Sequence, residues 1–230
     1  MAVLSYGASR MMAKAKQSIL GMRTELRFRK TFRKYREFTM IPEATYIANL
    51  WLAAKVDKIP GEVVECGTWR GGMIAGVADV LGSDRNYRLF DSFEGLPPAK
   101  EIDGAGALAW QQNTSGPFYR NNCRAEESEA RQAMAMSAGR RHTITKGWFN
   151  ETLPKAQVGP IALLLLDADW YDSTKQILDN LGCRMVPGGL IVVDDYYVWS
   201  GCTRAVNEHA ASKNWMIRQF GVGGGCYIVI

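Results

Sequence analysis

The chain is poor in the residues that build covalently or zinc-stabilised scaffolds. Its 230 residues include five cysteines and two histidines, and the cysteines are scattered, without a C-x-x-C pair. An odd, scattered set argues against a disulfide framework or a zinc cluster and favours a reducing, cytoplasmic compartment. No Ser or Cys is paired with a histidine in a recognisable pattern, so a nucleophilic dyad is not expected either.

Long apolar runs are also missing. No stretch approaches about 18 apolar residues, and the first ten residues lack the apolar segment of a signal peptide. We therefore expect a protein that is neither secreted nor membrane-spanning. With 47% apolar and 22% charged residues, the composition is typical of a globular protein. The length suits one full α/β domain and is short for two.

Positive charge is concentrated near the N-terminus. Residues 10–36 hold ten Lys or Arg and one Glu, which amounts to +9, whereas the whole chain carries +5. Apolar residues recur there at steps of three and four, at Met12, Ala15, Ile19, Met22 and Leu26. This spacing predicts a basic helical arm, 1–38, whose apolar seam packs on its own domain or on another subunit of a homo-oligomer. No base-reading motif accompanies the charge, so no nucleic-acid partner is expected.

From residue 39 onward, strand-like and helix-like segments alternate. Strands are expected at 63–66, 87–90, 142–145, 161–166, 190–193, 215–220 and 226–230, and helices at 42–58, 72–81, 126–137, 173–181 and 203–212. Such alternation predicts a mostly parallel sheet with helices on both faces. The short glycine-rich connection between the last two strands requires a hairpin. The aperiodic stretch 97–125 is expected to be a long active-site loop.

This layout predicts an α/β protein of the class I methyltransferase (Rossmann-like) type for residues 39–230. Such a fold is a three-layer sandwich around a mostly parallel seven-stranded sheet, closed by an antiparallel hairpin.

Carboxylates follow two of the apolar strands. One apolar run is followed by Asp167 and Asp169, and a second run, 27 residues later, by Asp194 and Asp195. Acids at the ends of parallel strands lie at the carboxyl edge of the sheet, where open α/β folds bind ligands. Three of these carboxylates gathered there would repel one another strongly unless a hard cation lies between them. The sequence therefore predicts a divalent-metal site.

The turn after the first strand indicates a nucleoside ligand. Its glycines follow the spacing G-x-x-x-G-G from Gly67, which departs from the G-x-G-x-x-G pattern of pyrophosphate-binding turns. Glu65 would repel a pyrophosphate but suits a cationic ligand. Asp91 ends the second strand, 24 residues after Gly67, where an acid usually accepts hydrogen bonds from ribose hydroxyls. An adenosyl ligand with a positive group, S-adenosylmethionine, satisfies both acids.

Five motifs together resemble the macrocin/mycinamicin sugar O-methyltransferase family. They are the stretches 64–72, 90–97, 146–154, 166–174 and 193–196, reading VECGTWRGG, FDSFEGLP, KGWFNETLP, LDADWYDST and VDDY. The resemblance runs from about Met40 to the C-terminus. It implies a Mg²⁺-dependent enzyme that uses S-adenosylmethionine to methylate hydroxyls of sugars, often on natural products. A small-molecule glycosidic acceptor is then the expected substrate.

The same resemblance implies roles for individual residues. The cofactor would be bound by Met40, Glu65, Gly67, Thr68, Gly71, Asp91, Ser92, Trp148 and Phe149, and the metal by Asp167, Asp194 and Asp195. The chain departs from the family's usual pattern at Ala168, where the family has Gly, and in most of the stretch 97–125. Those departures affect the part of the site that would bind the acceptor.

The expected chemistry needs a proton acceptor beside the metal. Asp167 is the first choice and Asp169 the second, because two residues along an extended chain return to the same face. Aromatic side chains crowd the same edge, and Trp170 and Tyr196 could stack on the acceptor. Two alternatives remain. A catechol-type O-methyltransferase would also gather carboxylates around Mg²⁺. A nicotinamide-dependent oxidoreductase would share the fold class, but the sequence lacks the pyrophosphate-binding glycine pattern of such enzymes.

Overall fold

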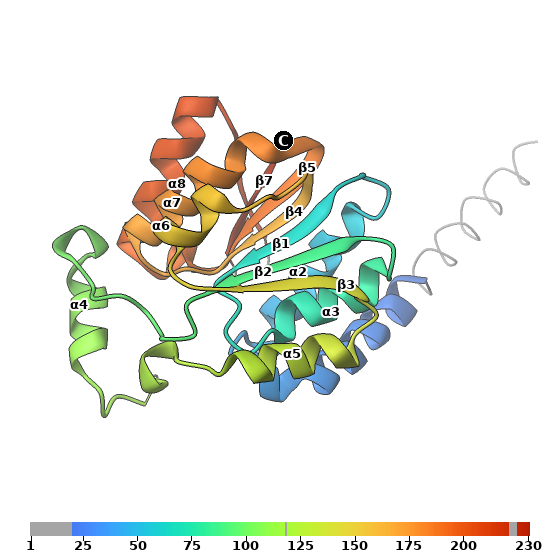
Figure 1. The fold of residues 1–230 in the computed structure, drawn as a ribbon, viewed down its shortest axis with the longest axis horizontal. Coiled ribbons are helices and arrows are strands. Elements are labelled where there is room, and N and C mark those ends of the chain that lie inside the picture. Colours follow the sequence, from blue (N-terminus) through green and yellow to red (C-terminus); the bar gives the residue numbers. More distant parts are fainter. Residues whose placement is uncertain (1–19, 118, 221–224) are drawn as a thin grey trace, which may run out of the picture.

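A computed structural model describes residues 20–117, 119–220 and 225–230. Its centre is a seven-stranded sheet with the strand order β3-β2-β1-β4-β5-β7-β6 (Figure 1). The strands are β1 (Glu62–Cys66), β2 (Asn86–Asp91), β3 (Arg141–Lys146), β4 (Ile161–Leu166), β5 (Met185–Val193), β6 (Ile217–Gln219) and β7 (Cys226–Val229). Strands β1 to β5 pair in parallel, whereas β7 is antiparallel to β5 and β6. The prediction of a parallel sheet closed by an antiparallel hairpin is confirmed.

Helices cover both faces of this sheet. One face carries α2 (Glu43–Lys55), α3 (Gly72–Leu81) and α5 (Glu127–Met136), and the other carries α6 (Phe149–Thr152), α7 (Tyr171–Leu181) and α8 (Ser200–Lys213) (Figure 1). Short 3-10 helices lie at Arg36–Phe38, Glu101–Asp103, Asn121–Cys123, Leu153–Lys155, Gly182–Arg184 and Asp195–Tyr197. Within the described ranges, no helix has the length and apolarity needed to cross a bilayer.

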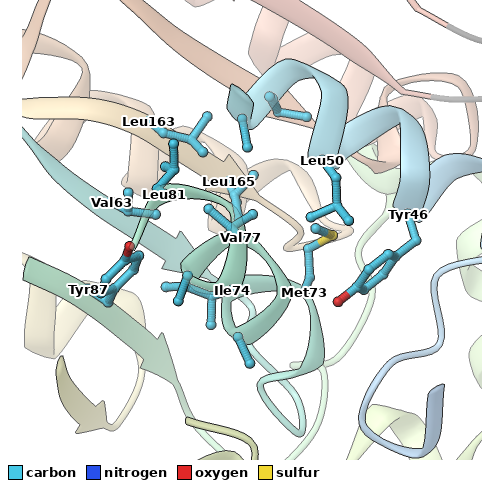
Figure 2. Close-up of a cluster of buried hydrophobic side chains, with 14 of the residues drawn as sticks. Tyr46, Leu50, Val63, Met73, Ile74, Val77, Leu81, Tyr87, Leu163 and Leu165 are labelled. Atoms are coloured by element: carbon cyan, nitrogen blue, oxygen red, sulfur yellow. The ribbon is translucent and has the colours of Figure 1, made fainter. Parts of the chain in front are cut away.

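The apolar runs form the two cores because successive strand residues point to opposite faces. All six residues of β4 are buried. Leu163 and Leu165 face α2 and α3, where they meet Ile74 and Leu50 (Figure 2), and Leu164 and Leu166 face the helices of the other layer. A strand covered on both faces needs an uninterrupted apolar sequence, which is the pattern that identified it.

The segment 97–125 departs from the expected loop. It contains a helix, α4 (Ala105–Gln112), with a 3-10 helix on each side. Among the residues of α4 only Ala107 is fully buried. The helix therefore has no apolar stripe, and the sequence shows no helical period there. The expectation of an irregular loop was therefore wrong for these eight residues.

Residues 20–35 are helical, as predicted for the basic arm, while Met12, Ala15 and Ile19 lie outside the described residues. Phe28 and Tyr35 on this helix are fully buried in the same core as α2 and α3. The core therefore does not close without residues that precede position 39. Met22 and Leu26 of the predicted seam are each 62% exposed.

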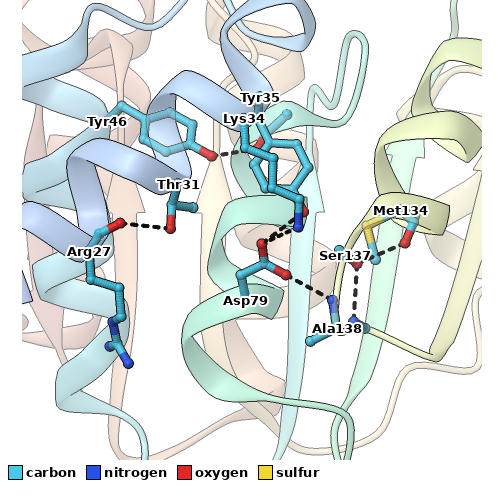
Figure 3. A network of polar contacts seen from close by, with 11 residues as sticks. Arg27, Thr31, Lys34, Tyr35, Tyr46, Asp79, Met134, Ser137 and Ala138 are labelled. Atoms are coloured by element: carbon cyan, nitrogen blue, oxygen red, sulfur yellow. Dashed lines mark hydrogen bonds and ion pairs between the residues drawn. The ribbon is translucent and has the colours of Figure 1, made fainter.

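Polar contacts also attach this helix to the domain. The Asp79 carboxylate on α3 accepts hydrogen bonds from Lys34 Nζ at 2.6 Å and from the Tyr35 hydroxyl at 3.0 Å (Figure 3). Its other oxygen accepts one from the Ala138 amide at 2.9 Å, just after α5. Burial and the nearby Asp79 charge raise the pKa of Tyr35, so this hydroxyl remains a donor. One carboxylate thus joins three segments.

Candidate active site

Three parallel strands end in register at the carboxyl edge of the sheet. Cys66 of β1 pairs with Leu166 of β4, which pairs with Val193 of β5. The amide of Asp167 continues the ladder by donating to the Cys66 carbonyl at 3.0 Å, and the amide of Asp194 donates to the Leu166 carbonyl at 3.1 Å. The residues that follow these strands therefore start side by side.

This register brings together the three predicted metal ligands. One carboxylate oxygen from each of Asp167, Asp194 and Asp195 lies within 4.8 Å of the others. Asp195 is buried, and the other two are half-buried. Asp194 Oδ1 is buried and has no hydrogen-bond partner among the described residues. An orphaned carboxylate oxygen beside two further carboxylates is the environment that a hard divalent cation satisfies.

The electrostatics of this group are unfavourable without a counter-charge. Burial and the neighbouring carboxylates raise the pKa of Asp194 to about 7 and that of Asp195 to about 8. The same causes raise the pKa of Asp167 well above its ordinary value. A bound cation reverses this balance because it stabilises the charged carboxylates.

Asp169 reaches the site by a different backbone path from the one expected. It adopts a left-handed conformation with φ of 57°, so the chain is not extended through it and the alternation argument for its face was wrong. Its amide donates to Asp195 Oδ2 at 3.0 Å, and its Oδ1 accepts from Trp199 Nε1 at 2.9 Å. Burial raises the pKa of Asp169 to about 7. Asp167 and Asp169 nevertheless line the same cavity.

Gly67 allows the turn after β1 to pass close to β4. Its φ is 84°, and a Cβ at this position would lie 1.5 Å from the carbonyl oxygen of Asp167. Before the turn, Glu65 is buried and accepts a hydrogen bond from the Thr68 hydroxyl at 2.6 Å. Burial raises the pKa of Glu65 to about 8. Glu65 and Thr68 line a small cavity that also contacts Gly67 and Asp167.

Asp91, at the end of β2, is held by two backbone amides. Its Oδ2 accepts from the Trp69 amide and its Oδ1 from the Phe93 amide, both at 2.7 Å. Burial raises the pKa of Asp91, although these amide bonds oppose that shift. Each oxygen retains a lone pair, so the carboxylate is fixed in place and can still accept hydrogen bonds from a ligand.

A cavity of about 210 Å³ opens at this edge. Ten of the residues predicted from the sequence line it: Met40, Gly67, Asp91, Ser92, Trp148, Phe149, Asp167, Asp169, Asp194 and Asp195. Its wall is mixed, because it combines carboxylates with aromatic and aliphatic side chains. Such a combination suits a ligand with both a polar and an apolar portion.

Five predicted residues do not line this cavity: Glu65 and Thr68 line the smaller one, and Gly71, Trp170 and Tyr196 line neither. Gly71 has a φ of 77° and precedes α3, and a Cβ there would lie 3.1 Å from Cα of Ala130 on α5. Trp170 is only 2% exposed. The Tyr196 hydroxyl donates to Asn207 on α8 at 2.9 Å. In this conformation Gly71 packs against α5, Trp170 is buried and Tyr196 contacts α8, so none of the three faces the cavity.

The cavity also includes residues that the sequence did not single out. Trp69, Leu96, Pro97 and Cys123 are among them. Trp69, Leu96 and Pro97 lie in two of the motifs quoted above and follow strand ends. Their position in the sequence could therefore have identified them as cavity residues. Cys123 had none, because it reaches the cavity from the aperiodic segment that contains α4.

The strand order and the cavity at its carboxyl edge define a class I methyltransferase fold. A sequence model of the family described as macrocin O-methyltransferase matches residues 37–218. The chain belongs to this family. Membership favours methyl transfer over the alternative of a nicotinamide-dependent oxidoreductase.

Two relatives named as O-methyltransferases support the same placement. The demethyldecarbamoylnovobiocin O-methyltransferase of Streptomyces niveus is 33% identical over 162 residues, which are 67% of this chain and 60% of that protein. The mycinamicin III 3''-O-methyltransferase of Micromonospora griseorubida is 30% identical over 160 residues, 66% of this chain and 61% of that protein. The chain thus matches about 60% of the length of these curated relatives.

A solved structure agrees with both findings. The O-methyltransferase NovP is similar to this chain with a TM-score of 0.70 and 28% identity, over 84% of this chain and 81% of that one. The similarity therefore extends over most of both folds.

Proposed function

We propose that this protein is a Mg²⁺-dependent methyltransferase of the cytoplasm that transfers a methyl group from S-adenosylmethionine to a hydroxyl of a glycosylated small molecule. The observation that supports it is the group of three carboxylates, Asp167, Asp194 and Asp195, in the same cavity as Asp91. The first feature suits a hard cation and the second a nucleoside. The acceptor class follows from the names of the relatives.

Different lining residues would bind different parts of the cofactor. In the proposal Asp91 accepts hydrogen bonds from the ribose hydroxyls of S-adenosylmethionine, and Trp148 and Phe149 border its adenine. Glu65 would lie near the cationic part of that ligand, whose positive charge would favour the ionised carboxylate despite its burial. When bound, the cofactor would supply an electrophilic methyl group, and a Mg²⁺ ion held by Asp167, Asp194 and Asp195 would polarise the acceptor hydroxyl.

We assign the role of proton acceptor to a carboxylate that is not one of the three proposed metal ligands. Asp167 is one of the three grouped carboxylates, whereas Asp169 lines the cavity outside that group. Asp169 would then accept the proton of the acceptor hydroxyl as the methyl group passes from the cofactor sulfur to that oxygen. The amide of Asp169 meanwhile anchors Asp195 at 3.0 Å, so base and metal group have a fixed relation.

The decisive experiment combines an activity panel with metal removal. Methyl transfer is followed by mass spectrometry on a set of glycosides, with catechols as a second arm, before and after exhaustive treatment with EDTA. We expect glycoside methylation that chelation abolishes and Mg²⁺ restores, while calorimetry shows that the demethylated cofactor still binds. Full activity after chelation would reject the metal assignment, transfer to catechols alone would reject the acceptor class, and binding of NAD in its place would reject the cofactor.

Substitutions compare the loss of a proposed metal ligand with the loss of an acidic side chain elsewhere in the protein. Asp194→Asn should lower kcat at least about 100-fold, since a metal-polarised hydroxyl is worth several kcal/mol in the transition state. Asp84→Asn, an exposed acid before β2, is the matched control and should leave kcat unchanged.

We also propose that the protein is a homo-oligomer. Supporting this, Met22 and Leu26 project from one side of the N-terminal helix, each with 62% of its surface exposed. The opposite side of the same helix, with Phe28 and Tyr35, is buried in the domain core. A second copy of this chain is the proposed partner for the exposed side.

A further inference from the structure

Three tryptophans from three separate segments meet beside the cavity. Trp110 comes from α4, Trp170 from the loop after β4, and Trp199 from the residue before α8. The ring centroids of Trp170 and Trp199 are 5.1 Å apart, those of Trp110 and Trp199 5.9 Å, and those of Trp110 and Trp170 6.2 Å. All three pairs are edge-to-face, which is a favourable arrangement of aromatic quadrupoles. Each ring is thus held by the other two.

Two indole N–H groups in this cluster have specific acceptors. Trp170 Nε1 donates to the Pro97 carbonyl at 2.9 Å, which ties the ring to the start of the segment that contains α4. Trp199 Nε1 donates to Asp169 Oδ1 at 2.9 Å. The position of the Trp199 ring therefore determines where one oxygen of the Asp169 carboxylate can lie.

Asp169 is held from its backbone as well. Its backbone adopts the left-handed conformation, with φ of 57°, and its amide donates a hydrogen bond to the Asp195 carboxylate. With the main chain fixed there, the side chain retains little freedom except rotation about its own bonds. The Trp199 N–H removes that rotation, because the hydrogen bond forms in only one orientation of the carboxylate.

The attachment of α4 depends on few contacts. Ala107 is its one fully buried residue, and Trp110 is half-buried against the other two rings. Gln111 adds polar contacts, since its Nε2 donates to the Pro97 carbonyl and to Asn122 Oδ1, each at 3.0 Å. Trp110 therefore provides an aromatic contact between α4 and the loops that carry Asp169 and Trp199.

We propose that Trp199 is a positioning residue for the Asp169 carboxylate and that Trp110 holds the Trp199 ring in place. The packing of α4 against the loops then determines the orientation of the Asp169 carboxylate, which accepts the proton of the reacting hydroxyl. The proposal rests on the proposed function for the role of Asp169, but the coupling between Trp110, Trp199 and Asp169 is a property of the folded chain and can be measured separately.

The first test observes the coupling without turnover. The chain has seven tryptophans, so a ¹H–¹⁵N spectrum of the indoles contains few signals, and Trp199→Phe identifies the one from Trp199. We expect Asp169→Asn and Trp110→Ala each to shift that signal, whereas Asp84→Asn should not. If Trp110→Ala leaves the Trp199 signal in place, the proposed coupling is wrong, whatever the enzyme's activity.

The second test reads the catalytic consequence. Trp199→Phe keeps an aromatic ring and removes the N–H, so kcat should fall about 10- to 100-fold while the KM for S-adenosylmethionine changes less than about twofold. Trp51→Phe is the matched control. Trp51 Nε1 also donates to a carboxylate, that of Glu25 on the helix of residues 20–35, at 3.1 Å. This substitution should change neither constant. A rise in KM without loss of kcat in Trp199→Phe would overturn the positioning role.

A double-mutant cycle completes the argument. Trp110→Ala alone should lower kcat, and in the Trp199→Phe background it should add little, because the N–H that it positions is already gone. Independent, multiplying losses would show that Trp110 acts by another route. A wild-type protein without methyl transfer would contradict the proposed function but would leave the indole shifts as evidence on the coupling.

Discussion

Asp91 is a carboxylate fixed by the main chain of its own site. Two amide hydrogen bonds of 2.7 Å come from Trp69 and Phe93, which both have positive φ values, 48° and 58°. The backbone on each side bends around the carboxylate, so its oxygens present their free lone pairs to the cavity. A group held in this way loses little freedom when it binds a hydroxyl pair.

Replacing Asp91 by Ala should weaken binding of S-adenosylmethionine or its demethylated product by about 1.5–3 kcal/mol, the range for charge-assisted hydrogen bonds. Calorimetric titration measures the change. Asp91→Asn keeps the shape of the side chain and isolates the loss of charge, and Asp84→Ala controls for removal of an acid elsewhere. Equal affinity in wild type and Asp91→Ala would refute the ribose assignment.

At the scale of elements, an ion pair joins β1 to β2. Glu62, at the start of β1, is 8% exposed and accepts from Arg88 Nε and Nη2, both at 3.1 Å, and from Asn86 Nδ2 at 3.0 Å. Burial alone would raise the pKa of Glu62, but the hydrogen bonds from Arg88 and Asn86 outweigh it and lower the pKa below its ordinary value. The charged form therefore stabilises the fold.

Glu62→Gln should lower the free energy of unfolding near neutral pH by about 1.5–3 kcal/mol. Folding lowers the pKa of this carboxyl, so its contribution is present above the unfolded pKa of about 4.3 and disappears as the pH falls through the folded value. Urea unfolding at neutral pH and at about pH 3 should show the difference between wild type and variant shrinking in acid.

The exposed pair of Asp57 and Lys58 supplies the control. Their side chains are 50% and 94% exposed, so Asp57→Asn should cost less than about 1 kcal/mol. A Glu62→Gln penalty that stays constant into acid would show that the variant acts through packing rather than through charge.

The whole molecule presents an apolar surface on the helix of residues 20–35. Deleting residues 1–36 would also remove Phe28 and Tyr35 from the core, so substitutions test its role better than truncation. Met22→Glu combined with Leu26→Glu should lower the particle mass in light scattering and keep the circular dichroism spectrum, because charges are costly in an apolar interface.

Met216→Glu changes an apolar residue that is 68% exposed near β6 and should leave the particle mass unchanged. If light scattering shows that the wild-type protein is a monomer, the oligomer proposal is wrong, and the exposed residues of this helix need no partner.

Much of the fold was decided locally in the sequence. Both faces of β4 are covered, so its apolar run is continuous, and α3 runs over Gly72–Leu81, the bounds that we predicted. The strand ends carried Asp91, Asp167 and Asp194, and parallel strands place such residues at one edge whatever the details of packing. Composition and periodicity determine these features because each depends on neighbours a few positions away.

The tertiary structure decided what depends on distant contacts. Helix α4 has no apolar stripe, so its place depends on tertiary contacts, among them those of Trp110 with Trp170 and Trp199. The left-handed backbone of Asp169 follows from its bonds to Asp195 and Trp199, which lie 26 and 30 positions away along the chain. Phe28 shows the same limit, because its neighbours on the helix are basic while its ring is buried in the core. Local sequence carries no record of such partners, since the contacts exist only once the chain has folded.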